Sequence, residues 1–224
     1  MRYMENGNAP SSGLFAQRGW LLAALAAVLL APLFRCGHLG SLDFWWWMSA
    51  TQLVLVAAAY LPDAGARAAL ASDLRGHLFR KIFIGLLSAV VLYGIFWLGN
   101  QLVRECLPQL AGHIGRLYQL KGDASTLRVV LLIGLVIGPC EELVWRGAIQ
   151  RALTAQLGPV RGLFLTTVLY AVVHLSSGNP LLLLAALVCG LFWGVLFQRT
   201  GSLALVVISH TAWDLAVYVL LPLG

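Results

Sequence analysis

Apolar residues run through the chain in long stretches that are separated by short polar segments. A helix that spans a bilayer needs about 20 mostly apolar residues, and several stretches approach or reach this length. They cover residues 19–34, 44–61, 82–100, 129–153, 160–175, 181–197 and 203–221. The pattern therefore predicts an all-α protein, a polytopic transmembrane helical bundle with about seven spanning helices.

The two longer polar segments carry a weaker helical pattern. Residues 61–81 hold several charged side chains and predict a loop with a helical piece at the membrane interface. Residues 101–128 mix charges with apolar residues at helical spacing, which indicates an amphipathic surface helix, with an ordinary loop as the alternative. Three consecutive tryptophans, Trp45, Trp46 and Trp47, predict an anchor in the headgroup region.

The composition agrees with lipid as the main solvent. Hydrophobic residues make up 60% of the chain and charged residues 11%, against about 25% charged residues in soluble domains. The net charge of +6 is not gathered in a basic patch, so we expect no nucleic-acid partner. We expect a polar N-terminal tail at residues 1–18 and a single membrane-embedded domain at 19–224, whose first apolar stretch is a retained membrane helix.

Lysine and arginine positions predict the orientation, because cytoplasmic loops carry an excess of both residues. With the N-terminus inside, the nine inner cations are Arg2, Arg18, Arg67, Arg75, Arg80, Lys81, Arg151, Arg161 and Arg199. The five outer cations are Arg35, Arg104, Arg116, Lys121 and Arg128. The excess favours an N-terminus inside and a C-terminus outside.

Small residues in the apolar stretches predict close packing. The pairs Gly134/Gly138 and Gly190/Gly194 have the spacing that lets two helices approach closely. The four cysteines contain no pair with CxxC spacing, so we interpret them as packing residues rather than as a disulfide framework or a zinc knuckle. Cys140, beside Glu141, lacks a neighbouring base on its own helical face.

Charged and polar side chains stand where lipid should reject them. A charged side chain at mid-bilayer costs about 2.5–3.5 kcal/mol on insertion scales. Three of the apolar stretches carry such groups, and the simplest explanation is that these groups face one another inside the bundle. The residues are Glu141, Glu142 and Arg146, then Tyr170 and His174, then His210 and Asp214.

Helical spacing pairs most of these groups. Each of the three i, i+4 pairs lies on one helix face, and Glu142 with Arg146 can form an ion pair there. This pairing leaves Glu141, about 100° around the helix, without a same-helix cation. It therefore needs partners from other helices, and His174 and His210 are available. Pro139 predicts a kink or break that admits water.

This set of groups predicts hydrolysis. A carboxylate beside a neutral imidazole can hold and deprotonate water, and Glu141 with His174 could form this pair. A second pair could stabilise an oxyanion, with His210 as the hydrogen-bond donor and Asp214 as the group that orients it.

The three motifs, Glu141-Glu142-x3-Arg146, Tyr170-x3-His174 and His210-x3-Asp214, resemble the signature of the CAAX-protease and bacteriocin-processing (CPBP, or Abi) family of glutamic-type intramembrane proteases. The resemblance covers about residues 131–221. Tyr170 stands where the family usually has Phe, and Asp214 where it often has Asn, which weakens the idea of an amide donor to the oxyanion.

The resemblance implies an all-helical bundle in a bacterial cytoplasmic membrane, no cofactor, and water activation by the first Glu and the first His. It also implies a membrane-associated protein or peptide substrate cleaved near its C-terminus or in its leader.

Three alternatives stay open. Glu141, His174 and His210 would suit a zinc site with one open position, which would make the protein a zinc-dependent protease. A non-catalytic membrane scaffold, immunity protein or transporter could also bury such groups. The predicted orientation places His174 toward the outer face, which favours a C-terminal sorting signal as the substrate over a cytosolic prenylated tail.

Overall fold

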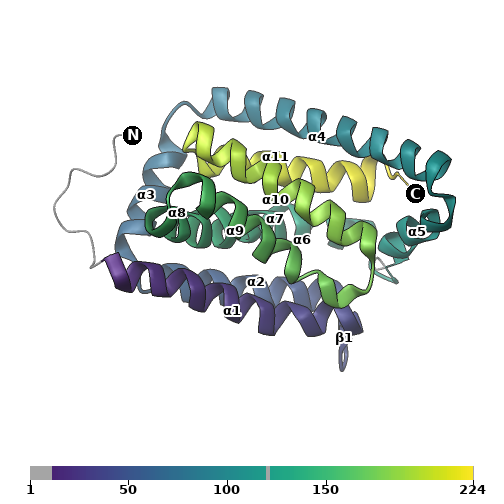
Figure 1. Cartoon of the computed structure of the whole chain (residues 1–224), viewed down its shortest axis with the longest axis horizontal. Coiled ribbons are helices and arrows are strands. Elements are labelled where there is room, and N and C mark those ends of the chain that lie inside the picture. The colour runs from purple at the N-terminus through teal and green to yellow at the C-terminus, as the bar shows by residue number, and fades with distance from the viewer. Residues whose placement is uncertain (1–11, 120–121, 224) are drawn as a thin grey trace.

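The computed structural model describes residues 12–119 and 122–223, and it shows a bundle of helices (Figure 1). The helices are α1 (Ser12–Cys36), α2 (Phe44–Tyr60), α3 (Ala64–Arg75), α4 (Leu78–Cys106), α5 (Ala111–Gln119), α6 (Thr126–Leu132), α7 (Gly138–Glu142), α8 (Arg151–Leu157), α9 (Pro159–Val172), α10 (Pro180–Thr200) and α11 (Leu203–Leu215). Two short strands, β1 (His38–Leu39) and β2 (Leu42–Asp43), pair antiparallel between α1 and α2. The all-α prediction is confirmed.

Side-chain caps fix the beginnings of several helices. The Asp43 carboxylate accepts hydrogen bonds from the backbone N–H groups of Trp45 and Trp46 and so starts α2 directly after the hairpin. Asn179 caps α10 and Ser202 caps α11 in the same way. These short polar residues supply acceptors for N–H groups that have no partner within the helix, so the polar linkers set the helix boundaries.

Five of the described helices are long and apolar enough to cross a membrane, and a sixth span results if α2 and α3 are counted together despite the 109° bend between them. The expected number of about seven was therefore too high by this measure. The run expected at 129–153 is helical from Thr126 to Leu157, but it is divided into short segments. The run expected at 44–61 is only 17 residues long as α2.

The divided helix contains two π-helical turns, Ile133–Ile137 and Leu143–Gln150, on either side of α7. Pro139 stands between the two turns, at the start of α7, and has no N–H to donate to the preceding turn. The helix thus widens at this proline instead of breaking. π-helical turns often mark functional sites, because they turn side chains out of the regular helical positions.

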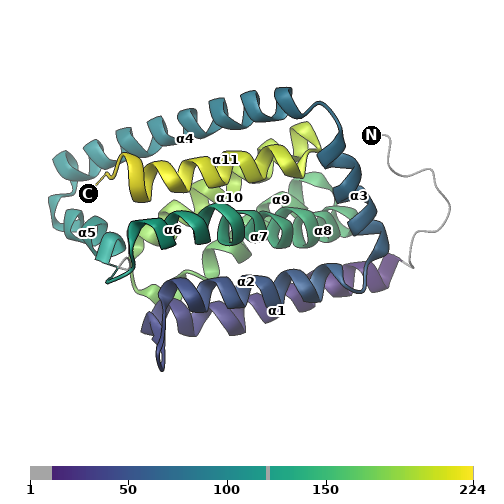
Figure 2. The same ribbon diagram turned by 180° about the vertical axis from the view of Figure 1, so that it is seen from behind.

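The helices form layers around the divided helix (Figures 1 and 2). α4 and α11 lie side by side along one edge, and α1 and α2 along the opposite edge. α3 runs across one end of the bundle and α5 lies at the other end. The divided helix contacts α1, α2 and α11 and thereby brings α7 into the interior.

The surface supports a membrane location. Large apolar side chains of α4, such as Phe83, Val90 and Leu98, are 58–69% exposed, as expected for a helix that faces lipid. Together with the long apolar helices, this surface identifies a multi-pass membrane protein.

Both polar segments contain helices. The interfacial piece expected within 61–81 is α3, and α5 lies within 101–128 and turns Ile114 and Leu117 toward an interior cavity. Of the predicted tail, residues 1–11 lie outside the described residues, whereas residues 12–18 already belong to α1.

Candidate active site

Glu141 lies on α7 and is 5% exposed. One carboxylate oxygen accepts a hydrogen bond from the Nε2 of Gln52 on α2 at 3.2 Å. The other accepts a hydrogen bond from the hydroxyl of Tyr170 on α9 at 3.1 Å. Glu141 therefore takes partners from other helices, as predicted from the pairing of Arg146 with Glu142 on another face of the helix.

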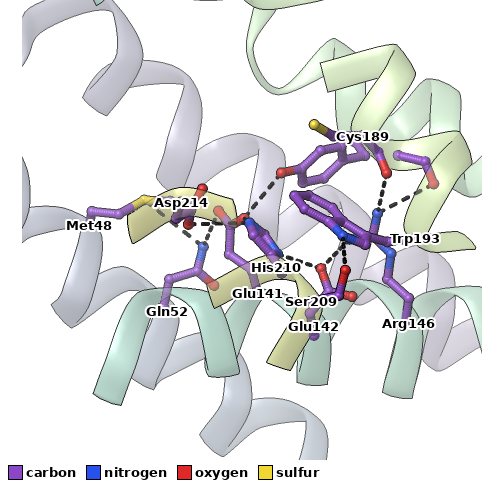
Figure 3. A network of polar contacts seen from close by, with 12 residues as sticks. Met48, Gln52, Glu141, Glu142, Arg146, Cys189, Trp193, Ser209, His210 and Asp214 are labelled. Carbon is purple, nitrogen blue, oxygen red and sulfur yellow. Dashed lines mark hydrogen bonds and ion pairs between the residues drawn. The ribbon is translucent and has the colours of Figure 1, made fainter. Parts of the chain in front are cut away.

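Glu142 and Arg146 form the predicted ion pair, with Nη1 and Oε1 2.9 Å apart and both side chains fully buried. The same carboxylate oxygen lies 2.6 Å from Nδ1 of His210 on α11. Arg146 also donates to the carbonyls of Cys189 and Gly190 on α10. The pair consequently joins the divided helix to α10 and α11, as Figure 3 shows.

His210 lies among three carboxylates. Its Nδ1 faces Glu142, and its Nε2 lies 3.4 Å from Oδ2 of Asp214 and 3.6 Å from Oε2 of Glu141. Trp193 stacks on the imidazole with ring centroids 3.7 Å apart and fixes its plane. Since ionised carboxylates only accept hydrogen bonds, an imidazole with a proton on each nitrogen satisfies this arrangement.

His174 lies at the end of α9 and is held differently. Its Nδ1 lies 2.8 Å from the backbone carbonyl of Tyr170. Because a carbonyl can only accept, Nδ1 carries the proton, and in the neutral ring Nε2 keeps a free lone pair. Phe34 of α1 packs on the ring at 4.4 Å between centroids. Among the described residues, no hydrogen bond or ion pair joins His174 to Glu141.

A cavity of about 320 Å³ connects these groups. Glu141, His174, His210 and Asp214 all line it. Most of the remaining lining residues are apolar and come from α2, α4, α5, α10 and α11; they include Met48, Phe96, Ile114, Leu182, Val188 and Trp213. The cavity thus combines a cluster of acids and imidazoles with walls that suit an apolar ligand.

The model of one protein family, type II CAAX prenyl endopeptidase Rce1-like, matches residues 123–216. Those residues form an Rce1-like domain of the CAAX-protease family. The match spans every motif residue from Glu141 to Asp214 and confirms the resemblance. No curated protein and no solved structure matches the chain.

The Rce1-like domain indicates a membrane hydrolase of the CAAX-protease type that acts on a membrane-associated protein. The structure brings its candidate catalytic residues to one cavity, where Glu142 contacts His210 and Tyr170 contacts Glu141, whereas Arg146 contacts Glu142. The expected pairings differ in two ways: the histidine that contacts Glu141 directly is His210 and not His174, and His210 contacts Glu142 as well as Asp214. The i, i+4 spacing could not predict this third contact, because it relates only residues on one helix.

Three contributing residues were not predicted. Gln52 holds Glu141, Trp193 stacks on His210, and Ser209 accepts a hydrogen bond from Trp193 Nε1 at 3.2 Å. Gln52 was the most detectable of these, because an amide in the apolar stretch 44–61 also needs a partner. Gln52 and α2 lie outside residues 123–216, so the site of the Rce1-like domain is completed by the N-terminal part of the chain.

Among the residues that the structure describes, no group of three His, Cys, Asp or Glu side chains has an arrangement that could hold a metal ion. The trio considered for zinc shares the cavity, but only His210 of its two histidines contacts Glu141. All four cysteines are free; Cys140 and Cys189 are buried, whereas Cys36 and Cys106 are exposed.

Proposed function

We propose that the Rce1-like domain is a glutamate-dependent intramembrane endopeptidase. The observation that supports this most directly is the shared cavity: Glu141, His174 and His210 come from three helices and line one apolar space. Its substrate is a membrane-associated protein that is cleaved near its C-terminus or in its leader. No cofactor takes part in this proposal.

In the proposed reaction, Glu141 is the general base. Its carboxylate takes one proton from a water molecule, while Nε2 of His174 accepts a hydrogen bond from the remaining O–H and orients the water. The water oxygen attacks the carbonyl carbon of the scissile peptide bond. Gln52 and Tyr170 hold the Glu141 carboxylate in place.

His210 stabilises the negative charge that develops on the carbonyl oxygen. Its Nε2 lies close to Glu141 and Asp214. It can donate a hydrogen bond to the oxyanion that forms when water attacks the carbonyl carbon. Before the attack Asp214 orients the ring through Nε2, and it gives up this N–H to the oxyanion while Glu142 holds Nδ1. When the C–N bond breaks, the proton on Glu141 passes to the leaving amine and the carboxylate is restored.

Comparative peptidomics tests the function. Membranes and secreted peptides from cells with the wild-type protein are compared with those from Glu141→Ala cells. We expect peptides with new C-termini or N-termini only in the wild type. Glu105→Ala removes an exposed acid from the end of α4 and is the matched control, which should keep the wild-type peptides. If Glu141→Ala leaves both peptides and biological activity unchanged, a scaffold function replaces this proposal.

Chelation distinguishes the glutamate mechanism from the zinc-dependent alternative. Purified protein treated with a strong chelator should keep its cleavage activity under the proposed mechanism. Loss of activity that added zinc restores would assign Glu141, His174 and His210 to a metal site instead.

The location completes the proposal. We place the protein in a bacterial cytoplasmic membrane with the N-terminus inside, on the excess of cations at one end of the bundle. The loop at 176–180, which follows His174, then lies on the outer side. A C-terminal sorting signal exposed on that side is therefore the preferred substrate within the proposed class.

A further inference from the structure

The last described residues return to the catalytic cavity. After the helical turn Ala216–Leu220, the chain passes beside α5 and the end of α4 (Figure 2). The side chain of Leu223 lines the same cavity as Glu141 and His210. We name residues 221–223 the C-terminal strap.

The main chain of the strap is bound by side chains. The Tyr93 hydroxyl donates to the Leu221 carbonyl at 3.1 Å. Asn100 Nδ2 and Arg104 Nη2 donate to the Leu223 carbonyl at 2.9 and 3.2 Å. The Leu223 N–H donates to the Tyr118 hydroxyl at 2.7 Å. We call these four side chains, three from α4 and one from α5, the cradle.

The cradle is built for a peptide main chain. Arg104 Nε donates to Oδ1 of Asn100 at 3.2 Å, which turns the amide so that its NH2 group faces the bound carbonyl. The bonds use one N–H and two C=O groups and no polar side chain of the strap. Another peptide with an N–H and carbonyls at this spacing could therefore make the same bonds.

The surroundings select apolar side chains. The cavity that Leu223 lines also has Phe96, Val103, Ile114 and Leu117 in its wall. Arg104 adds a positive charge, which would bind a carboxylate more strongly than a neutral carbonyl. The ligand class that fits is thus a short apolar peptide whose last carbonyl or carboxylate meets Asn100 and Arg104.

We propose that the cradle is a substrate-binding subsite which the protein's own strap occupies, so that the strap competes with substrate for the cavity. This inference rests on the proposed function, because it makes the substrate a peptide. A tethered competitor is present at about millimolar effective concentration, so displacement favours substrates that bind the apolar walls as well as the cradle.

Peptide binding tests the strap without requiring cleavage. The probe is a fluorescein-labelled peptide with the sequence of residues 220–224, and its anisotropy is measured with detergent-solubilised protein in the Glu141→Gln background. We expect deletion of residues 221–224 to tighten binding about tenfold. In the shortened chain, Asn100→Leu should weaken binding about tenfold, whereas Gln101→Leu, one residue along α4 and exposed, should change nothing.

Two results would overturn the proposal. Equal binding by the full and shortened chains would show that the strap does not compete. Binding by the shortened chain that Asn100→Leu does not weaken would place the peptide in the micelle or elsewhere on the protein.

Leu223→Gly provides a second route if the shortened chain does not fold. This variant keeps the main-chain bonds and removes the side chain from the cavity, so about threefold tighter binding is expected. A strap that only anchors α11 predicts a lower melting temperature for Leu223→Gly and no tighter binding. Because neither readout requires cleavage, failure here is separate from failure of the peptidomics experiment.

Discussion

Glu141 and Glu142 are adjacent in the sequence and lie in different electrostatic surroundings. Glu142 contacts Arg146 and His210, a permanent cation and a group that can become one. Glu141 accepts hydrogen bonds from the neutral groups of Gln52 and Tyr170, and lies near only one edge of His210. Glu141 is thus available to exchange a proton, whereas the carboxylate of Glu142 is held by Arg146 and His210.

Replacing Gln52 tests how Glu141 is held. In Gln52→Leu the Glu141 carboxylate loses a buried hydrogen-bond donor. We therefore expect kcat to fall about tenfold. KM should stay unchanged, because Gln52 positions the base and does not bind substrate. The measurement is cleavage kinetics on purified protein. Gln150→Leu is the matched control: Gln150 is also buried but donates to the Gly194 carbonyl, away from Glu141. A change in KM alone for Gln52→Leu would contradict this role.

Replacing Arg146 tests the ion pair. Arg146→Met leaves Glu142 buried without its permanent counter-charge, and breaking a buried pair in this way costs about 3–5 kcal/mol. We expect a clearly lower melting temperature in detergent. Arg199→Met, at the exposed end of α10, should melt like the wild type. The double variant Glu142→Leu/Arg146→Met should recover much of the loss, and failure to do so would mean that the pair is not the source of the effect.

At the residue scale, the sequence predicted the charged members of the site because lipid makes unpaired charges costly. It did not predict Gln52 or Ser209, since neutral polar groups cost less in an apolar helix and give a weaker signal. It also did not predict that Glu142 contacts His210. Arg146 had already satisfied that carboxylate on its own helix, and contacts between helices depend on an arrangement that spacing alone does not give.

At the scale of elements, helices were found in all the predicted apolar stretches, and their boundaries differed. α4 extends to Leu78 and Cys106, beyond the predicted 82–100, because a helix can continue past the apolar region into polar surroundings. The division of the fourth stretch by π-helical turns was not predicted. Hydrophobic patterning reports which residues face lipid, and a buried polar helix carries little of that signal.

The glycine pairs give a prediction at this scale. A Cβ at Gly138 would lie 2.5 Å from Thr211 Oγ1 and 3.3 Å from Thr211 Cα, so α7 and α11 touch there. A Cβ at Gly134 would meet nothing within 4 Å. Gly138→Ala should therefore push α11 and His210 away, with a loss of about 1–3 kcal/mol from overpacking and lower activity.

Gly134→Ala is the matched control for this prediction. It should leave the melting temperature unchanged or raise it, because alanine is favoured over glycine in a helix by about 0.5–1 kcal/mol. Equal effects of the two variants on melting temperature would show that contact between α7 and α11 is not tight.

At the scale of the whole molecule, lysines and arginines are more numerous at one end of the bundle than at the other. Along the described chain, the end of the bundle that holds α3 carries Arg18, Arg67, Arg75, Arg80, Lys81, Arg151, Arg161 and Arg199. The end that holds α5 carries Arg35, Arg104, Arg116 and Arg128. Arg2 and Lys121, one from each side of the predicted count, lie outside the described residues. The asymmetry favours the α3 end as the cytoplasmic one.

Cysteine labelling tests this orientation. Cys36 and Cys106 are exposed at the ends of α1 and α4, toward the α5 end, whereas Cys140 and Cys189 are buried. A membrane-impermeant maleimide should therefore label intact bacterial cells through the two exposed thiols. The control is Ser72→Cys on α3 in a chain with Cys36→Ser and Cys106→Ser, which should be labelled only after the membrane is permeabilised. The reverse pattern would place the α5 end in the cytoplasm, together with the loop after His174 and the cradle. A sorting signal exposed outside could then no longer be the preferred substrate.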